Sequence, residues 1–269
     1  RIEVLDGAAS SLYGSDAIGG VLSLYTNHVP TEPLSGSVQI FGRSNNEQIG
    51  VTAKLGGRHG KWFYRVGATL IDYADYRVPT DSIQYYSYWI RLKDQRLRNT
   101  AGCERDGSVM LGYAGYRFHT DMRISDSYSK SGFFANAHGL EVRLSDIDYD
   151  HSRRDIDLPY QWVNHLKVLS HTSWQGDRLR AEANLAWQNN HREELSEPVS
   201  HGYMPKPDGT LERRFVKNTL TGNVALHFPI GSRHELSAGV NAEYQHNRRG
   251  GWGFIIPDFE TASVGVYAM

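Results

Sequence analysis

The sequence lacks several features that would place it in a common protein class. It has one cysteine, Cys103, so no disulfide can form within the chain, and cysteine usage leaves the redox compartment open. Its 29 basic and 30 acidic residues give a formal net charge of −1, without the basic excess of a nucleic-acid-binding protein. No apolar run approaches the roughly 18 residues that a membrane-spanning helix needs. We therefore expect no internal disulfide, no nucleic-acid partner and no transmembrane helix.

The glycine-rich opening also lacks the residues of a phosphate-binding loop. In residues 1–26, RIEVLDGAASSLYGSDAIGGVLSLYT, the last two glycines precede Val21 and Leu22 instead of the Lys and Ser/Thr of a Walker loop. The Gly-x-Gly-x-x-Gly spacing of a dinucleotide site does not occur there either. The opening is therefore interpreted as a tight turn between two strands.

Aromatic residues and glycine are abundant, with 16 Tyr, 9 Phe, 6 Trp and 27 Gly, which favours strands and tight turns over helices. From Ser35 onward, apolar and polar residues alternate with a period of two. In residues 118–124, one face is apolar and the other carries His119, Asp121 and Arg123. The same alternation predicts strands of about ten residues around residues 49–55, 62–70, 166–174, 179–187, 220–228 and 236–244.

The predicted connections fall into two classes. Tight links are expected at residues 56–60, 114–117, 175–177 and 229–233. Long polar loops are expected at every second connection, and therefore on one side of the sheet, at residues 73–103, 129–164 and 190–213. Short turns at one rim and long loops at the other are typical of an outer-membrane β-barrel.

Large aromatic residues are expected at or near the strand ends, where a girdle at a lipid interface would lie: Trp62, Trp174, Trp187, Phe228 and Tyr244. A soluble β-sandwich with one wet face is the alternative, and it would bury its apolar face against a second sheet. A sandwich gives no reason for long and short connections to alternate. The pattern therefore favours a barrel.

Residues 1–26 resemble the end of the plug domain of TonB-dependent outer-membrane receptors. In that family an Arg-[Ile/Val]-Glu-Val strand leads into a Leu-Tyr-Gly-x-x-Ala-x-Gly-Gly turn and a hydrophobic strand, and only Asp6 and Ala8 depart from the commonest form. Less distinctive resemblance continues in residues 127–141 and 154–168. The resemblance implies an all-β fold in which the C-terminal end of a plug domain and a linker (1–34) precede the N-terminal part of a transmembrane antiparallel β-barrel (35–269).

The strand count predicts that the barrel is incomplete. Plugged transporter barrels have about 22 strands, and this chain has room for about ten. We therefore expect residues to be missing at both ends, and we expect the sheet not to close by itself.

The resemblance implies a transport receptor without bond chemistry, cofactor or resident metal. Such a receptor captures a scarce metal chelate, a ferric siderophore first and cobalamin or haem next, and imports it to the periplasm. The implied energy source is the TonB-ExbB-ExbD complex, acting through a segment that this chain lacks. Outer-membrane lipid surrounds the implied barrel, and some members of the family use a surface lipoprotein as a lid. The alternatives are an outer-membrane barrel enzyme (a protease or lipase, with Asp148 and His151 as a candidate pair), a passive porin and a soluble binding module.

The candidate ligand-binding residues lie in the long loops. Aromatic rings there could stack on a chelate or a sugar, and arginines could pair with an anionic chelate. The alternative is that the rings pack the loops against one another. The candidates are Tyr85, Tyr86, Tyr88 and Trp89 in the first loop, and Phe133, Phe134, His138, Arg153, Arg154, Tyr160 and Trp162 in the second.

Two further sets of candidates concern the plug. The turn residues are Gly14, Asp16, Gly19 and Gly20, whose glycines allow positive φ and close backbone approach or only shape the turn. The alternation predicts that Arg180, Glu182, Glu235 and Glu243 point into the lumen, where they could pair with Arg1, Glu3 or Asp16 and hold a resting state. The 12 histidines lack the spacing of a structural zinc site, so no metal site is expected. His138 and His201 are the candidate axial ligands if the cargo is haem.

Overall fold

The computed structural model describes residues 2–6, 19–24, 29–85, 88–134, 152–198, 200, 203, 205–231 and 234–269. Arg1, Gly14, Asp16, Tyr86, His138, Asp148, His151 and His201, which the sequence analysis named, lie outside these residues. Within the described part, the elements are β1 (Ile2–Asp6), β2 (Gly20–Leu24), β3 (Ser35–Arg43), β4 (Gln48–His59), β5 (Trp62–Tyr73), β6 (Ser82–Tyr85), β7 (Tyr88–Arg91), the 3₁₀ turn η1 (Lys93–Gln95), β8 (Gly102–Ala114), β9 (Phe118–Gly132), β10 (Tyr160–Gln175), β11 (Arg180–Leu195), β12 (Leu211–Ile230), β13 (His234–Gly250) and β14 (Phe259–Ala268).

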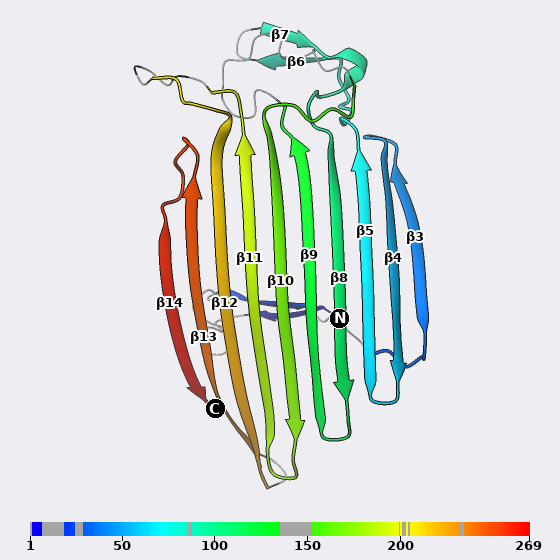
Figure 1. Ribbon diagram of the computed structural model, residues 1–269, viewed down its shortest axis with the longest axis vertical. Coiled ribbons are helices and arrows are strands. Elements are labelled where there is room, and N and C mark those ends of the chain that lie inside the picture. Colours follow the sequence, from blue (N-terminus) through cyan, green and yellow to red (C-terminus); the bar gives the residue numbers. More distant parts are fainter. Residues whose placement is uncertain are drawn as a thin grey trace.

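Ten of these strands form one antiparallel sheet in the order β14-β13-β12-β11-β10-β9-β8-β5-β4-β3 (Figure 1). Each strand pairs with the next large strand along the chain, so the sheet is a meander of hairpins. β6 and β7 form a separate small hairpin inside the connection between β5 and β8. None of the helices in the described residues has the length and apolarity to cross a bilayer. The all-β prediction is confirmed.

The connections differ at the two ends of the sheet, which we call the turn end (the lower end in Figure 1) and the loop end. Tight turns close the turn end at residues 60–61, 115–117 and 176–179, and β12 ends and β13 begins at this end as well. At the loop end the chain passes from β3 to β4, from β5 to β8, from β9 to β10, from β11 to β12 and from β13 to β14. The three long predicted connections do share one end. The tight link expected at residues 56–60 is wrong, because β4 runs on to His59 before the chain turns.

The strands also continue farther toward the loop end than predicted. β9 runs to Gly132 and β10 begins at Tyr160, so the second long loop is shorter than expected. The third loop is shorter for the same reason, since β11 ends at Leu195 and β12 begins at Leu211. The connection at residues 44–47 is a tight turn among the long loops.

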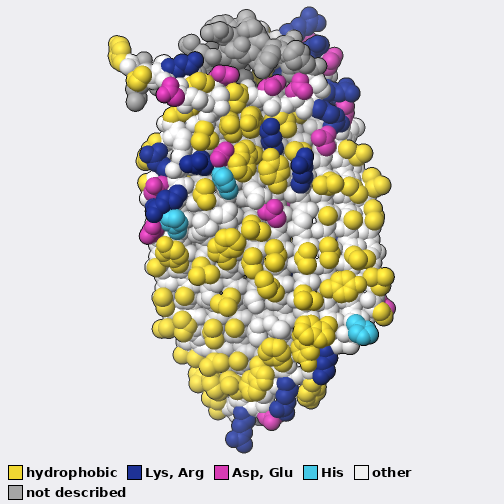
Figure 2. Space-filling view, viewed as in Figure 1, with side chains coloured by type: hydrophobic (Ala, Val, Ile, Leu, Met, Phe, Trp, Pro, Cys, Tyr) yellow, Lys and Arg dark blue, Asp and Glu magenta, His cyan; other side chains and the backbone are white. Residues whose placement is uncertain are grey.

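The register gives the sheet two chemically different faces. Paired residues that share one face form what we call the apolar face. One row of paired residues across it is Val66, Val109, Ile124, Val168, Trp187, Leu220 and Tyr244, and all of these side chains except the half-buried Val168 are exposed. The adjacent row lies on the opposite, polar face and reads Gly67, Ser108, Ser125, Lys167, Gln188, Thr219 and Gln245. Figure 2 shows the apolar side chains spread over the middle and lower part of one face of the molecule.

Within the described residues, substantial contacts between elements occur only between neighbouring strands of one sheet. No second layer therefore packs on the apolar face in this part of the chain, and Val109 (52% exposed) and Val266 (77% exposed) lie open on it. A β-sandwich would cover these side chains with another sheet. The sandwich alternative does not fit, and the fold is part of an antiparallel β-barrel.

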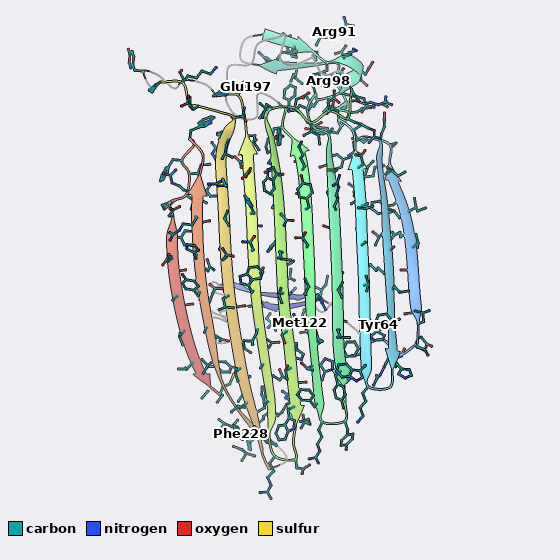
Figure 3. All side chains as sticks on the ribbon, viewed as in Figure 1. Tyr64, Arg91, Arg98, Met122, Glu197 and Phe228 are labelled. Atoms are coloured by element: carbon teal, nitrogen blue, oxygen red, sulfur yellow. The ribbon has the colours of Figure 1, made fainter. Side chains whose placement is uncertain are left out.

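Aromatic side chains mark both limits of the apolar stretch. Trp62 contacts Tyr113 edge-on, with ring centroids 5.2 Å apart, and both lie near the turn end. Phe228 lies near the same end (Figure 3). The prediction that Trp187 and Tyr244 lie near strand ends is wrong, because β11 and β13 continue beyond them toward the loop end. They lie where the apolar stretch ends.

The opening forms the antiparallel pair β1–β2, from Ile2 opposite Leu24 to Asp6 opposite Gly20. In Figure 1 this pair lies behind the large sheet, on the side opposite the apolar face seen in Figure 2. Gly20 has φ of +140°, and a Cβ built there would lie 2.6 Å from the carbonyl oxygen of Leu5. A side chain at this position would collide with backbone, so glycine is required. Among the described residues, no atom lies within 4 Å of a Cβ built on Gly19, so close approach to them does not explain that glycine.

Candidate functional site

The polar face is hollowed. A cavity of about 830 Å³ lies between the segment Val29–Glu32 and residues of six neighbouring strands, β3, β4, β5, β8, β9 and β10. Residues from six adjacent strands can line one cavity only if the polar face is concave. The segment is tied to the wall by the backbone of Arg58, whose N–H donates to the carbonyl oxygen of Glu32 at 2.9 Å. The segment Val29–Glu32 therefore lies against the inside of the curved sheet.

The lining of this cavity is rich in charge and hydroxyl groups. Four cations, Lys54, Arg65, Arg123 and Lys167, line it together with the acids Glu32 and Asp106. Serines from β3, β8 and β9 complete the wall. Such a surface is wetted by water and can hydrogen-bond a polar solute or a polar protein segment.

The polar face of β10–β13 carries a chain of side-chain amides. His171 Nδ1 lies 2.7 Å from Asn184 Oδ1, and the amide of Asn184 donates to Asn223 at 3.5 Å. Asn223 in turn donates to Asn241 on β13. The chain crosses four strands at one level. It is a continuous polar strip, which the sequence analysis did not identify as a network.

The four charged residues predicted to face the lumen all lie on the polar face, at Arg180, Glu182, Glu235 and Glu243. Their observed partners lie within the sheet. Arg180 Nε is 3.5 Å from Glu182 Oε1, and Glu243 accepts a 2.7 Å hydrogen bond from Gln245. Glu235 lies 3.4 Å from His227 Nδ1. Glu3, on β1, is half-buried. Contacts between these charges and the opening remain a prediction.

At the loop end, the β6–β7 hairpin stands above the strand ends (Figure 1). A small apolar cluster supports it, in which Ile90 and Phe134 are buried and Ile83 and Leu97 pack against them. Phe134 therefore packs two loops together. The Trp89 side chain is 68% exposed and is available to a ligand. Tyr85 and Tyr88 pair through their backbones at the tip of the hairpin.

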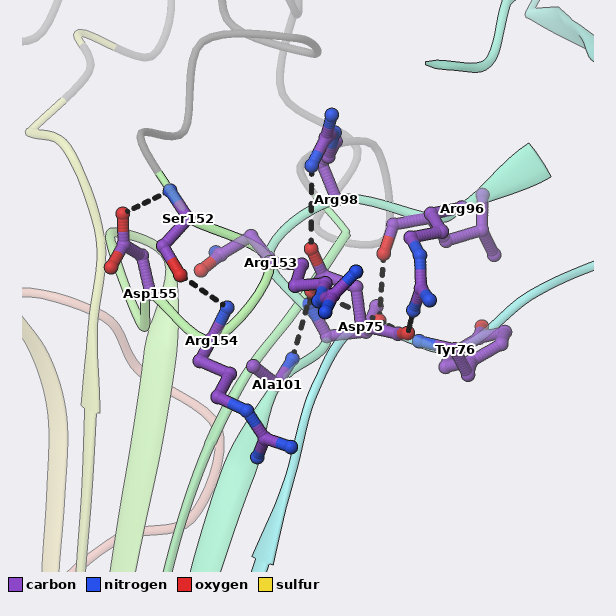
Figure 4. A network of polar contacts seen from close by, with 12 residues as sticks. Asp75, Tyr76, Arg96, Arg98, Ala101, Ser152, Arg153, Arg154 and Asp155 are labelled. Atoms are coloured by element: carbon purple, nitrogen blue, oxygen red, sulfur yellow. Dashed lines mark hydrogen bonds and ion pairs between the residues drawn. The ribbon is translucent and has the colours of Figure 1, made fainter. Parts of the chain in front are cut away.

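A network of charges holds the loops on the sheet (Figure 4). The buried Arg96 donates to Glu47 Oε1 at 2.6 Å and to the carbonyl oxygen of Asp75 at 2.5 Å. The buried carboxylate of Asp75 accepts the backbone N–H groups of Thr100 at 2.6 Å and of Ala101 at 3.0 Å. These bonds join the first long loop to the tight turn between β3 and β4. We call this set of residues, with Arg98, Arg153 and Arg154, the loop-end network.

Arg153 and Arg154 belong to this network. Arg153 Nε lies 2.9 Å from Glu47 Oε2, and its carbonyl oxygen accepts the backbone N–H of Asp75 at 2.8 Å. Arg154 pairs with Asp72 and donates to the carbonyl oxygen of Glu47 at 2.9 Å. The two side chains tie the second long loop to the β3–β4 turn and to β5, and the backbone of Arg153 ties it to the first long loop. Figure 3 shows Arg98 of this network in the loops above the strands.

Tyr160 and Trp162 do not lie in a loop. They lie at the start of β10. Tyr160 pairs with Gly132 and Trp162 pairs with Lys130, which puts both on the same face as Ile124. Phe133 lies just after β9, and its N–H donates to the carbonyl oxygen of Pro159 at 2.9 Å. The sequence therefore identified these residues as a group at the loop end but not the surface on which Tyr160 and Trp162 lie.

Among the described residues, no group of three or more His, Cys, Asp or Glu side chains could hold a metal ion. The arrangement offers instead a concave polar wall, a rigid platform of loops and an exposed aromatic ring. Sequence reasoning missed the loop-end network, because its members are far apart in the chain.

The comparisons with known proteins support the fold. No family model matches the sequence, and no curated protein matches it. Among solved structures, the siderophore receptor PirA from Pseudomonas aeruginosa is similar over 99% of this chain and 39% of its own, with a TM-score of 0.63 and 14% identity. PirA from Acinetobacter baumannii is similar over 92% of this chain and 35% of its own, with a TM-score of 0.62 and 18% identity.

The ferric yersiniabactin uptake receptor FyuA from Yersinia pestis is similar over 100% of this chain and 48% of its own, with a TM-score of 0.53 and 14% identity. The chain thus spans less than half the length of each of these three receptors. At such identities the likeness shows the fold, part of an antiparallel β-barrel, and the similar proteins are receptors for transport.

Proposed function

We propose that this chain is part of a TonB-dependent outer-membrane receptor that imports a scarce metal chelate into the periplasm. In this proposal residues 1–34 are the C-terminal end of the plug domain and its linker, and residues 35–269 are the N-terminal part of the barrel. The observation that carries it is the single-layer sheet with an open apolar face, a concave polar face and a segment of the chain lying in the hollow. The similarity to siderophore receptors supports the same function.

The dimensions of the apolar face support insertion in a bilayer. On β5 it extends from Trp62 to Leu70, which is about 27 Å along the strand at about 3.4 Å per residue. A tilt of about 40° reduces this to a band roughly 21 Å tall, close to the roughly 25 Å band of outer-membrane barrels. The aromatic residues at both limits of the band are then interfacial anchors.

The ligand is proposed to bind at the loop end. A flat, exposed ring such as Trp89 offers stacking area for a chelate, and the hairpin that carries it is held in place by the packing of its own Ile90 against Phe134. A ferric siderophore is the first candidate, because three of the similar structures are siderophore or ferric-siderophore receptors. Cobalamin and haem are the next candidates. A surface lipoprotein that closes over the loops is an additional partner in this proposal.

Transport is proposed to use energy from the TonB-ExbB-ExbD complex. The pair β1–β2 and the following segment lie on the concave side, where a plug would block the lumen. The lumen-facing Arg180, Glu182, Glu235 and Glu243 are available to hold such a plug at rest. Force applied upstream of this chain would then have to break these contacts, and loss of one partner leaves a charge without compensation.

A growth experiment tests the proposal. A strain deleted for the gene is grown on a panel of ferric siderophores, haem and cobalamin as single sources, with and without the TonB complex. Loss of growth on one source, restored by the gene only in cells with the complex, is the expected result. Restoration without the complex would indicate a porin. Cleavage of peptide or lipid by the purified protein, without an uptake defect, would indicate an enzyme.

A further inference from the structure

The apolar face changes character toward the loop end. On β9 the residues that follow Ile124 on this face are Asp126, Tyr128 and Lys130. Across the pairs on either side lie Arg105 of β8, opposite Tyr128, and Trp162 of β10, opposite Lys130. Figure 2 shows basic, acidic and His side chains on this upper part of the face, above the apolar stretch.

Five of these side chains form one surface, which we call the aromatic–basic patch: Arg105, Tyr128, Lys130, Tyr160 and Trp162. The ammonium of Lys130 lies 4.3 Å from the ring centroid of Tyr160. The rings of Tyr128 and Trp162 are nearly parallel, 6.4 Å apart, and the Trp162 ring also contacts His191 at 4.5 Å. The rings lie beside one another, so the patch combines an aromatic surface with two cations.

Neighbouring acids do not cancel both cations. Asp72 of β5, which is paired with Cys103 of β8, forms an ion pair with Arg154 of the loop-end network. Glu193, opposite Trp162, lies 3.1 Å from His191 Nε2. Asp126 lies on the same face, one alternate position nearer the turn end than Tyr128. Among the described residues, neither Arg105 nor Lys130 forms an ion pair, so both cations are open to an anionic group.

We propose that the aromatic–basic patch binds the phosphorylated headgroup of an outer-leaflet lipid. This inference rests on the proposed function, because lipid reaches the patch only if the apolar face lies in a bilayer. Acyl chains would then cover the stretch that ends at Ile124, and the headgroup would lie level with Lys130. Aromatic rings favour this interface, and Arg and Lys pair with phosphate through charge-assisted hydrogen bonds.

The patch also differs from a site for free phosphate. Its rings offer apolar area next to the cations, and the acyl stretch continues directly below it. A lipid uses all three features at once, whereas inorganic phosphate uses only the cations. Each cation near an anionic lipid surface contributes about 1 kcal/mol, or about fivefold in affinity, so removing both should weaken binding about 25-fold.

The test uses the purified full-length receptor and titrates two lipids by native mass spectrometry: diphosphorylated lipid A and the same lipid without its phosphates. The double variant Arg105→Gln/Lys130→Gln removes the charge of the patch. Lys206→Gln is the matched control, since it removes an exposed cation from the loop end outside the patch. Lys130→Arg keeps the charge of the patch and should retain most of the parent protein's affinity for the phosphorylated lipid.

The expected result is that the parent protein and Lys206→Gln prefer the phosphorylated lipid, while the double variant binds both lipids equally. Millimolar inorganic phosphate should not displace the lipid. Equal binding of both lipids by the parent, an equal loss in Lys206→Gln, or displacement by phosphate would overturn the patch proposal alone. Binding of neither lipid by the parent would overturn the membrane location, and with it the proposed function.

Discussion

The buried carboxylate of Asp75 provides a sharp test of how the loops are held. It accepts the backbone N–H groups of Thr100 at 2.6 Å and Ala101 at 3.0 Å, and Arg98 Nη1 lies 4.0 Å from its second oxygen. Asp75 and Ala101 are fully buried. The substitution Asp75→Ala would therefore leave two backbone donors without their acceptor in a place that water does not reach.

The magnitude follows from the two bonds. A hydrogen bond to a charged group contributes about 1.5 to 3 kcal/mol, so losing two should cost at least about 3 kcal/mol. The ten-stranded sheet does not depend on this carboxylate, so the loss should appear as local opening of residues 74–101. A cost of about 3 kcal/mol corresponds to a more than 100-fold larger open population.

Amide hydrogen exchange measured by mass spectrometry is the assay. Peptides that contain Thr100 and Ala101 should exchange more than 100-fold faster in Asp75→Ala, while peptides from β9 and β12 keep their protection. Asp81→Ala is the control, since Asp81 is an exposed aspartate of the same loop. Among the described residues, its side chain accepts a hydrogen bond only from the hydroxyl of Ser82. Unchanged protection at residues 100 and 101, or an equal loss in the control, would refute the reasoning.

Three other outcomes follow from the two faces and the loops. Val224→Arg, on the apolar face, should destabilise the folded protein in lipid by about 2 to 4 kcal/mol, and Asn223→Arg beside it by much less; urea titration in vesicles measures both. Gly112→Ala should lower the melting temperature, because its Cβ would lie 2.2 Å from a phenylalanine ring, whereas Gly107→Ala has nothing within 4 Å. Trp89→Ala should weaken chelate binding at least tenfold in fluorescence titration, without a change in melting temperature.

The sequence predicted the middle of the sheet well because one face of each strand there is apolar and the other is polar. On β9, Phe118 and Ile124 share one face while Asp121 and Arg123 share the other, as the alternation predicted. The tight turn at 115–117 was likewise readable from its glycine and polar residues. A period of two is visible wherever one face is apolar and the other polar.

The same reasoning explains why the strand ends were misplaced. Beyond Ile124 the residues on both faces of β9 are polar, so no contrast marks the strand. Tyr160 and Trp162 were assigned to a loop for this reason. Trp187 was expected at a strand end because the apolar pattern stops there, although β11 continues to Leu195. Hydrophobic periodicity therefore located the apolar band and not the limits of the strands.

The loop-end network was not predictable from local pattern. It joins Glu47, Asp75, Arg96 and Arg153, which are brought together only when the hairpins of the sheet are formed. Two arginines proposed as ligand contacts, Arg153 and Arg154, form ion pairs within it. Their part in ligand binding stays a prediction, as do the contacts between the lumen charges and the opening.

The central claim is that the apolar face meets acyl chains while the polar face meets a water-filled lumen. Spin labels on single cysteines, introduced in a Cys103→Ser background, test it most directly at the adjacent β8 positions Ser108 and Val109 of the receptor in vesicles. The account predicts that the label at Val109 is accessible to oxygen and shielded from a water-soluble nickel reagent, and that the label at Ser108 shows the reverse. Equal access of the nickel reagent to both labels would contradict it.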